Sequence, residues 1–287
     1  MTEVMVIMDD TLVIMFWILV SSGYYSCCEW LERRKLCDAD KWASFAFVIL
    51  VIHVCVCAFQ FDIFLKWLRD NGAYFPNLYF KCYAKNVRGV HAKTNIPNYQ
   101  RFMQIPLKCL ITDQMARNTP IGRRLQKVSS QLTVPNHCQV IVYMLMTRAR
   151  GDSFFQPYYD VLPEDFNNFP IFWDEEALGW LKGSVLVQQI KDRKANIRSD
   201  YDAICAALPE FRCFSFKEFL WCRTAVGSRN FSIVVHGEKR TAMVPQADML
   251  NHLRPRECSW TFDNAANSFV ITSLTKIPKD AQVYYSI

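Results

Sequence analysis

Residues 244–252 read VPQADMLNH, an apolar stretch that ends in the dipeptide Asn251-His252. Around it lie short strand-like runs at 231–235, 241–244, 259–263, 268–274 and 281–287. Asn, Asp and Pro separate these runs, and such residues are typical of turns between short strands. The pattern predicts that the C-terminal part of the chain is rich in short β-strands.

A helical block precedes this region. Apolar residues recur at helical spacing in 175–182, 185–207 and 216–226, after a segment interrupted by Pro157, Pro163 and Pro170. Further upstream, 79–83, 89–92 and 102–105 are strand-like, whereas 62–71 and 138–150 are helical. Gly72 is the expected stop of the first of these helices, and Thr112 is a candidate helix cap. The sequence therefore predicts an α+β fold of short strands interrupted by a helical insertion.

The composition excludes several kinds of chemistry. The net charge is +6, but no run of Lys and Arg is long enough for a nucleic-acid surface, so we predict no nucleic-acid partner. The twelve cysteines contain no C-x-x-C pair, which favours reduced and mostly buried thiols. No G-x-G, P-loop, G-x-S-x-G or H-E-x-x-H pattern occurs, which argues against a Rossmann-type loop, a nucleotide phosphate loop, a serine hydrolase and a zinc protease.

A metal site is not predicted either. Asp248 and His252 could share one face of a helix, but only Glu257 is placed to join them as a further ligand.

The first 60 residues form a separate apolar segment. Residues 43–59 carry no formal charge, and a helix of this length would be marginal for crossing a bilayer. Three interpretations stay open for residues 1–60: a membrane helix through 43–59, an apolar helical segment packed on the protein or on a membrane surface, and an extension that is not native to the mature protein.

Several short motifs occur in a specific order. They are RGVHA at 88–92, IP at 105–106, SRNF at 228–231, VPQADMLNH at 244–252, and QVYYS at 282–286. Together with the helical interruption, they resemble the SET-domain protein methyltransferases. The subclass with a helical insertion, which includes the Rubisco large-subunit lysine methyltransferase and the actin-histidine methyltransferase, is the most similar. The resemblance covers residues 61–287 and implies a SET-type fold.

The resemblance also implies S-adenosylmethionine as the cofactor. The turn that contains Asn86, Arg88 and Gly89 would wrap this methyl donor, mainly through its backbone. Arg229 would pair with the donor carboxylate, a task suited to a guanidinium fork. Asn251 would bind the amino-acid end of the donor, and His252 would contact the adenine. Asp248 would support the turn that carries these two residues.

The resemblance places three aromatic residues, Phe231, Tyr284 and Tyr285, in a channel for the acceptor. Methyl transfer needs the donor sulfonium and a neutral acceptor nitrogen held in line, and a dry aromatic channel favours the neutral amine. Each of these residues also has an ordinary structural interpretation, such as a surface cation, a turn cap or a core aromatic. By the same resemblance, an aromatic residue at position 231 implies lysine rather than histidine as the acceptor.

The expected organisation has four parts: residues 1–60, residues 61–151 as the first half of the SET domain, residues 152–227 as the insertion, and residues 228–287 as the second half. Family members continue after the QVYxS motif with Tyr-Gly and a further helical domain, whereas Ile287 stands at the position of that tyrosine. We therefore expect the second half to be truncated.

Two functions follow from this resemblance, and the N-terminal segment adds a third hypothesis, a membrane-tethered protein whose apolar N-terminus is its main functional element. One is methyl transfer to a side-chain nitrogen of a protein substrate, in the cytoplasm or on the cytoplasmic face of a membrane. The alternative is a catalytically inactive SET-like remnant that acts as a protein-binding module.

Overall fold

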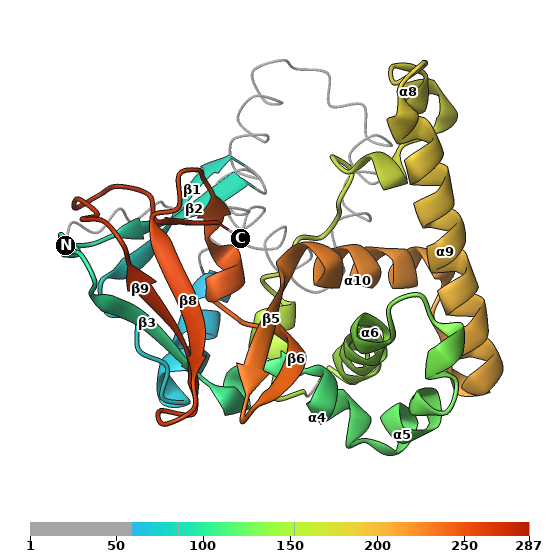
Figure 1. Ribbon diagram of the computed structural model, residues 1–287, viewed down its shortest axis with the longest axis horizontal. Coiled ribbons are helices and arrows are strands. Elements are labelled where there is room, and N and C mark those ends of the chain that lie inside the picture. The colour runs from blue at the N-terminus through green and yellow to red at the C-terminus, as the bar shows by residue number, and fades with distance from the viewer. Residues whose placement is uncertain (1–58, 85–86, 152, 287) are drawn as a thin grey trace, which may run out of the picture. The chain divides into compact units, whose positions relative to one another are not determined.

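Short ladders build the strand-rich part of the molecule (Figure 1). The computed structural model describes residues 59–84, 87–151 and 153–286, which belong to one compact unit. The strands are β1 (Leu78–Ala84), β2 (Val87–Ala92), β3 (Arg101–Pro106), β4 (Ile111–Thr112), β5 (Asn230–Val235), β6 (Glu238–Met243), β7 (Asn251–His252), β8 (Cys258–Asp263), β9 (Ser268–Ser273) and β10 (Tyr284–Tyr285).

These strands pair in small sheets. The order β3-β9-β8 forms one antiparallel sheet and β4-β6-β5 forms another, while β1 pairs with β2. Only the pair β7-β10 is parallel among the ladders of the described residues, with Asn251 opposite Tyr284 and His252 opposite Tyr285. Strand β9 is almost entirely buried, so its apolar run SFVITS lies in the core between two partners.

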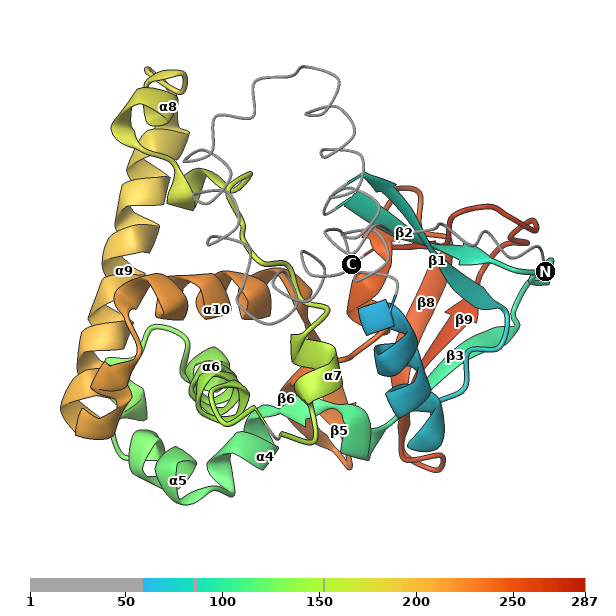
Figure 2. The same cartoon turned by 180° about the vertical axis from the view of Figure 1, so that it is seen from behind.

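Helices form the other side of this unit, as Figures 1 and 2 show from the front and from behind. Besides a helix over residues 59–70, the α-helices are α4 (Asp113–Arg117), α5 (Pro120–Gln126), α6 (Pro135–Arg148), α7 (Gln156–Tyr159), α8 (Glu175–Gly179), α9 (Val185–Ala207) and α10 (Phe216–Arg229). Short 3-10 helices occur at Leu107–Cys109, Ser129–Gln131, Pro170–Phe172, Pro209–Cys213 and Ala247–Met249. Helix α6 is buried on nearly every side because α4, α5 and α10 pack around it.

Side-chain caps fix where several helices begin. Thr112 accepts a hydrogen bond from the backbone N–H of Met115 at 3.1 Å, which confirms its predicted role as a helix cap. Ser215 and Glu218 form a reciprocal capping box at the start of α10. Helix α10 ends at Arg229, so this cap defines the N-terminal end of the helix that carries a predicted site residue.

Some predicted boundaries differ from the structure. Helix α6 begins at Pro135 rather than Cys138, because proline is well suited to the first helical turn. Helix α8 ends at Gly179, before the predicted Lys182. The first described helix spans residues 59–70 and ends before Gly72, whose φ of +86° suits the predicted helix stop. Its buried face holds Phe64 and Leu68 as predicted, but Ile63 is 43% exposed.

The prediction of a separate apolar N-terminal segment concerns residues 1–60, and all but the last two lie outside the described residues. The same holds for the candidate membrane helix at 43–59, apart from Phe59. Among the residues that the structure describes, no helix is both long and apolar enough to cross a membrane. The four domain boundaries stay a prediction, and helical packing already begins at α4, before residue 152.

Candidate functional site

Three distant segments of the sequence meet at the parallel pair β7-β10. Strand β10 lies beside β7. Val283, directly before β10, pairs with β2, because its N–H donates to the carbonyl of Val90 at 2.8 Å. An isolated bridge also pairs His91 with Gln282. The motifs RGVHA, NH and QVYYS, predicted to share a site, therefore lie side by side.

Asn251 ties these segments together through its side-chain amide. Its Nδ2 donates to the backbone carbonyl of Arg88 at 2.9 Å and to Oε1 of Gln282 at 2.6 Å. Gln282 in turn donates from Nε2 to the phenol oxygen of Tyr284 at 2.7 Å. The Asn251 side chain thus uses both of its N–H donors within the chain, and its Oδ1 accepts no hydrogen bond from any described residue.

Gly89 lies directly beneath this network. A Cβ atom at position 89 would overlap Oε1 of Gln282 and would lie 2.9 Å from the hydroxyl of Tyr83. The missing side chain therefore makes room for Gln282, which reaches over β2 toward Asn251. The resemblance implied that Gly89 permits a close approach of the donor, and the structure shows a close approach of Gln282.

A buried ion pair connects the end of α10 to the Ala247–Met249 turn. Nη1 of Arg229 donates to the backbone carbonyl of Asp248 at 3.0 Å and to its Oδ2 at 3.3 Å. The hydroxyl of Tyr158 in α7 donates to the same Oδ2 at 2.8 Å. The side chain of Asp248 is 0% exposed and that of Arg229 is 17% exposed, so both charges depend on each other for compensation.

One polar atom of each residue in this pair has no hydrogen-bond partner among the described residues. Burial raises the pKa of Asp248, while Arg229, the Tyr158 hydrogen bond and Arg88 oppose the rise. Oδ1 of Asp248 and Nε of Arg229 are buried and have no hydrogen-bond partner among the described residues. A buried polar atom normally has a partner, so these two atoms mark a position suited to a polar ligand.

The guanidinium of Arg88 lies near that of Arg229. Its Nη2 donates to the carbonyl of Val161 at 3.1 Å and approaches the sulfur of Met249 at 3.0 Å, while its guanidinium lies 4.9 Å from the ring centre of Phe61. Burial and then the nearby Arg229 lower the pKa of Arg88 to about 10. The resemblance implied mainly backbone contacts here, but the side chain of Arg88 is itself anchored beneath the site.

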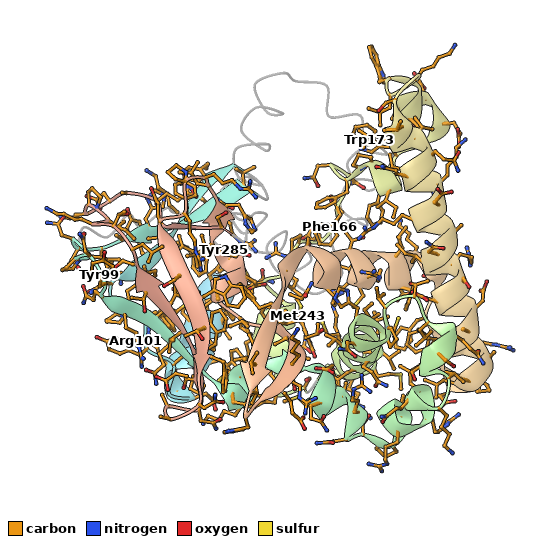
Figure 3. All side chains as sticks on the ribbon, viewed as in Figure 1. Tyr99, Arg101, Phe166, Trp173, Met243 and Tyr285 are labelled. Atoms are coloured by element: carbon orange, nitrogen blue, oxygen red, sulfur yellow. The ribbon has the colours of Figure 1, made fainter. Side chains whose placement is uncertain are left out.

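Two of the three predicted channel residues belong to one aromatic cluster. Phe231 stacks on Tyr285 with ring centres 5.4 Å apart, and it also contacts Trp260 and Phe269. Both Phe231 and Tyr285 are buried, and burial raises the pKa of Tyr285 to about 12. Figure 3 shows Tyr285 among the strands.

Tyr284 lies apart from this cluster. Adjacent strand residues point to opposite faces, and the hydroxyl of Tyr284 joins Gln282 and Asn251 instead. The structure therefore places Tyr284 with the predicted donor-binding residues rather than with Phe231 and Tyr285.

His252 is exposed at the edge of the site. Its ring centre lies 4.2 Å from that of Tyr285, and partial burial lowers its pKa. A surface pocket of about 320 Å³ is lined by His252, Leu253, Arg254 and Ser286. Asn86, the remaining predicted donor-binding residue, lies outside the described residues.

No metal centre accompanies these side chains in the described part of the chain. There, no three residues among His, Cys, Asp and Glu gather closely enough to hold a metal ion. Asp248, one of the two ligands considered from the sequence, is instead paired with Arg229.

Two residues of this arrangement received no role from the sequence. Gln282 was part of a recognised motif, but nothing in the local sequence indicates that its amide bridges Asn251 and Tyr284. Tyr158 precedes Asp248 by 90 positions, so its hydrogen bond depends on the folded arrangement. The available signal for Gln282 was its place in the QVYYS motif at 282–286.

The fold and the site together define the structural class: the described residues have the fold of a SET domain. The chain is similar to the SET domain of LSMT bound to lysine and AdoHcy, with a TM-score of 0.69, 24% identity, and coverage of 80% of this chain and 54% of that one. It is also similar to Rubisco LSMT bound to AdoMet, with a TM-score of 0.65, 24% identity, and coverage of 79% and 52%.

The chain is also similar to curated proteins of known activity. The actin-histidine N-methyltransferase of Callithrix jacchus is 25% identical over 203 residues, which cover 67% of this chain and 34% of the relative. The enzyme of the same name from Homo sapiens is 24% identical over the same length and coverage. The chain thus spans about a third of the length of these relatives. No protein-family model matches it.

Proposed function

We propose that this chain binds S-adenosylmethionine and takes part in methyl transfer to a side-chain nitrogen of a protein. The observation that carries the proposal is the meeting of Arg229, Asp248 and Asn251 beside β2 and β10. The SET fold and the relatives named as N-methyltransferases support it.

The residues present fit the amino-acid end of the donor. The unpartnered Nε of Arg229 is a cationic donor suited to a carboxylate, and Oδ1 of Asn251 is an acceptor suited to an ammonium group. Asp248 holds Arg229 in place, and Tyr158 holds Asp248, so the guanidinium is fixed before a ligand binds.

The bound donor would supply an electrophilic methyl group on a sulfonium. In the transfer, the lone pair of the acceptor nitrogen forms the new N–C bond while the S–C electron pair returns to sulfur. The nitrogen must therefore be unprotonated. The buried rings of Phe231 and Tyr285 exclude water, which disfavours the charged form of an amine held beside them.

For the acceptor we propose lysine, with histidine as the second candidate. The aromatic cluster around Phe231, together with the likeness to a SET domain solved with lysine, favours the first. The curated relatives are named as actin-histidine methyltransferases, which favours the second. We propose that the protein acts in the cytoplasm or at the cytoplasmic face of a membrane, where donor and protein substrates meet.

Calorimetric titration of S-adenosylmethionine into the full chain tests the donor site. Saturable binding is expected, and Asn251→Ala should weaken it by about tenfold because one polar contact to the ligand is lost and the link to Gln282 is broken. Asn98→Ala serves as the matched control, since Asn98 is exposed and makes no side-chain hydrogen bond with the described residues.

The absence of binding to a folded chain would contradict the proposal and favour the binding-module alternative. If the donor binds, mass spectrometry of peptide arrays that contain lysine or histidine acceptors distinguishes the two candidates. Methylation of histidine alone would contradict the proposed lysine preference.

A further inference from the structure

A groove of about 340 Å³ lies within the helical block, between α9, α10 and the segment that contains the 3-10 helix Pro170–Phe172. This segment lies between Phe166 and Trp173, which are labelled in Figure 3. The groove ends at Gly227 and Ser228 of α10, directly before Arg229. One end of the groove therefore adjoins, along α10, a residue of the candidate methyl-donor site.

One stripe of α9 forms the apolar wall of the groove. Leu186, Ile190, Arg193 and Ile197 follow each other at spacings of three and four residues, which places them on one helix face. Ile171 and Phe169 complete the apolar lining. Arg193 is the only charged residue in this stripe.

A second arginine faces the groove from α10. Arg223 is only 7% exposed, and its Nη1 approaches Nδ1 of His137 at 3.3 Å. Its Nε is buried and has no hydrogen-bond partner among the described residues. The two guanidinium groups come together at Gly227, where an added Cβ atom would lie 3.1 Å from Nη1 of Arg223 and 3.8 Å from Nη2 of Arg193.

No carboxylate of the described residues forms an ion pair with either arginine. Asp200 attracts Arg223, but its carboxylate already accepts hydrogen bonds from the N–H and hydroxyl of Thr133 at 2.7 and 2.5 Å. A buried cation without a paired anion is costly, and this cost is reduced when an anion binds.

We propose that this groove binds an acidic side chain of a protein partner, with an adjacent apolar side chain packed against α9. Arg193 and Arg223 would together hold the carboxylate, and the stripe of Leu186 and Ile190 would bury the apolar neighbour. Because the groove and the donor site adjoin on α10, we take this partner to be the methyl acceptor. This step rests on the proposed function.

The lining favours a peptide over a small inorganic anion. One wall is apolar over several residues, so a ligand that is charged throughout would leave this surface unused. The groove is open at the surface through Leu186 and Arg193, which lets a chain segment lie across it.

The test uses two dye-labelled peptides with blocked ends that differ at one position, Ala-Leu-Glu-Leu-Ala and Ala-Leu-Gln-Leu-Ala. Fluorescence anisotropy with the full chain should give at least tenfold tighter binding of the glutamate peptide, because only its carboxylate forms charge-assisted hydrogen bonds. Arg193→Gln should remove this preference. Lys194→Gln removes the same charge from an exposed neighbour and should preserve it.

Gly227→Ala provides a variant that keeps every charge. Its methyl group would stand between the two guanidinium groups, so glutamate-peptide binding should weaken about tenfold while the thermal unfolding midpoint is maintained. Equal binding of both peptides would overturn the proposal, as would a preference that survives in Arg193→Gln. Binding of a phosphoserine peptide but not of the glutamate peptide would also overturn it.

These measurements contain no S-adenosylmethionine. Failure of donor binding therefore leaves the peptide preference intact, and failure of the peptide preference leaves donor binding unaffected.

Discussion

Nη1 of Arg229 donates two hydrogen bonds to Asp248, one to its backbone carbonyl at 3.0 Å and one to its Oδ2 at 3.3 Å. The side-chain contact compensates a buried charge, and the backbone contact fixes the turn that leads into β7. The end of α10 and the position of Asn251 are therefore coupled.

Replacing Arg229 should destabilise the fold as well as the site. Arg229→Ala leaves the Asp248 carboxylate buried without its cation, and we expect the free energy of unfolding to fall by about 3 kcal/mol. Urea denaturation measures this change. Arg101→Ala removes an arginine from the more exposed pair with Asp263 and should lower the free energy of unfolding far less, because solvent screens an exposed ion pair. Equal losses in both variants would contradict the structural role of Arg229.

Gly89→Ala should impair donor binding with little loss of stability. The new methyl group displaces the end of the Gln282 side chain, which is flexible, so the free energy of unfolding should fall by only about 1 kcal/mol, the low end of the cost of an added methyl group in a packed site. Asn251 then loses its hydrogen bond to Gln282 and keeps the one to the carbonyl of Arg88, and affinity for S-adenosylmethionine should fall about tenfold by calorimetry.

Shortening residue 282 provides the control for Gly89. Gln282→Ser in the Gly89→Ala background relieves the overlap without restoring the hydrogen bonds, so binding should stay weak. Recovery of full affinity would show that overlap alone, and not the link to Asn251, is responsible.

The cap of α10 should affect stability without affecting chemistry. Ser215→Ala removes the hydroxyl that accepts the N–H of Glu218, and we expect a loss of about 1 kcal/mol in the free energy of unfolding. Donor affinity should be unchanged in the folded protein, because Arg229 lies at the opposite end of the helix. A large change in affinity at unchanged stability would contradict this view.

Acid should destabilise the protein partly through His137. Burial, followed by Arg223 and Arg193, lowers the pKa of His137 from 6.5 to about 4, so the unfolded chain binds more protons in this window. The free energy of unfolding should therefore decrease as the pH falls from 6.5 toward 4. His137→Asn keeps an acceptor for Arg223 and should reduce this slope; the pKa of His252 is also lowered, so some slope remains. An unchanged slope would exclude His137 as a contributor.

Local patterns predicted much of the fold. Helix α9 was predicted with the same bounds, 185–207, because its apolar spacing is a local signal; the structure adds Ser184 as its N-terminal cap. Thr112 and Gly72 were similarly recognised as helix boundaries. The proline that starts α6 was overlooked, since Pro135 is not part of the apolar run.

The site could be predicted only in outline. The motifs identified Arg229, Asp248 and Asn251 as a group, but the pairing of Arg229 with Asp248 depends on three-dimensional packing. The separation of Tyr284 from Tyr285 follows from strand alternation once the ladder with β7 is known. The roles assigned to these residues in donor and acceptor binding stay predictions.

The meeting of β2 with the residues before β10 has a kinetic consequence. His91 and Asp280, for example, are joined by a hydrogen bond although they are 189 positions apart. Contacts between residues this far apart in the sequence form slowly, because a long loop must close before they contribute to stability. During synthesis on the ribosome, β1, β2 and the helical block can all form before the last ladder exists. Asn251 therefore acquires its partners from β2 and Gln282 at the end of folding, so the site is expected to report complete folding of this unit.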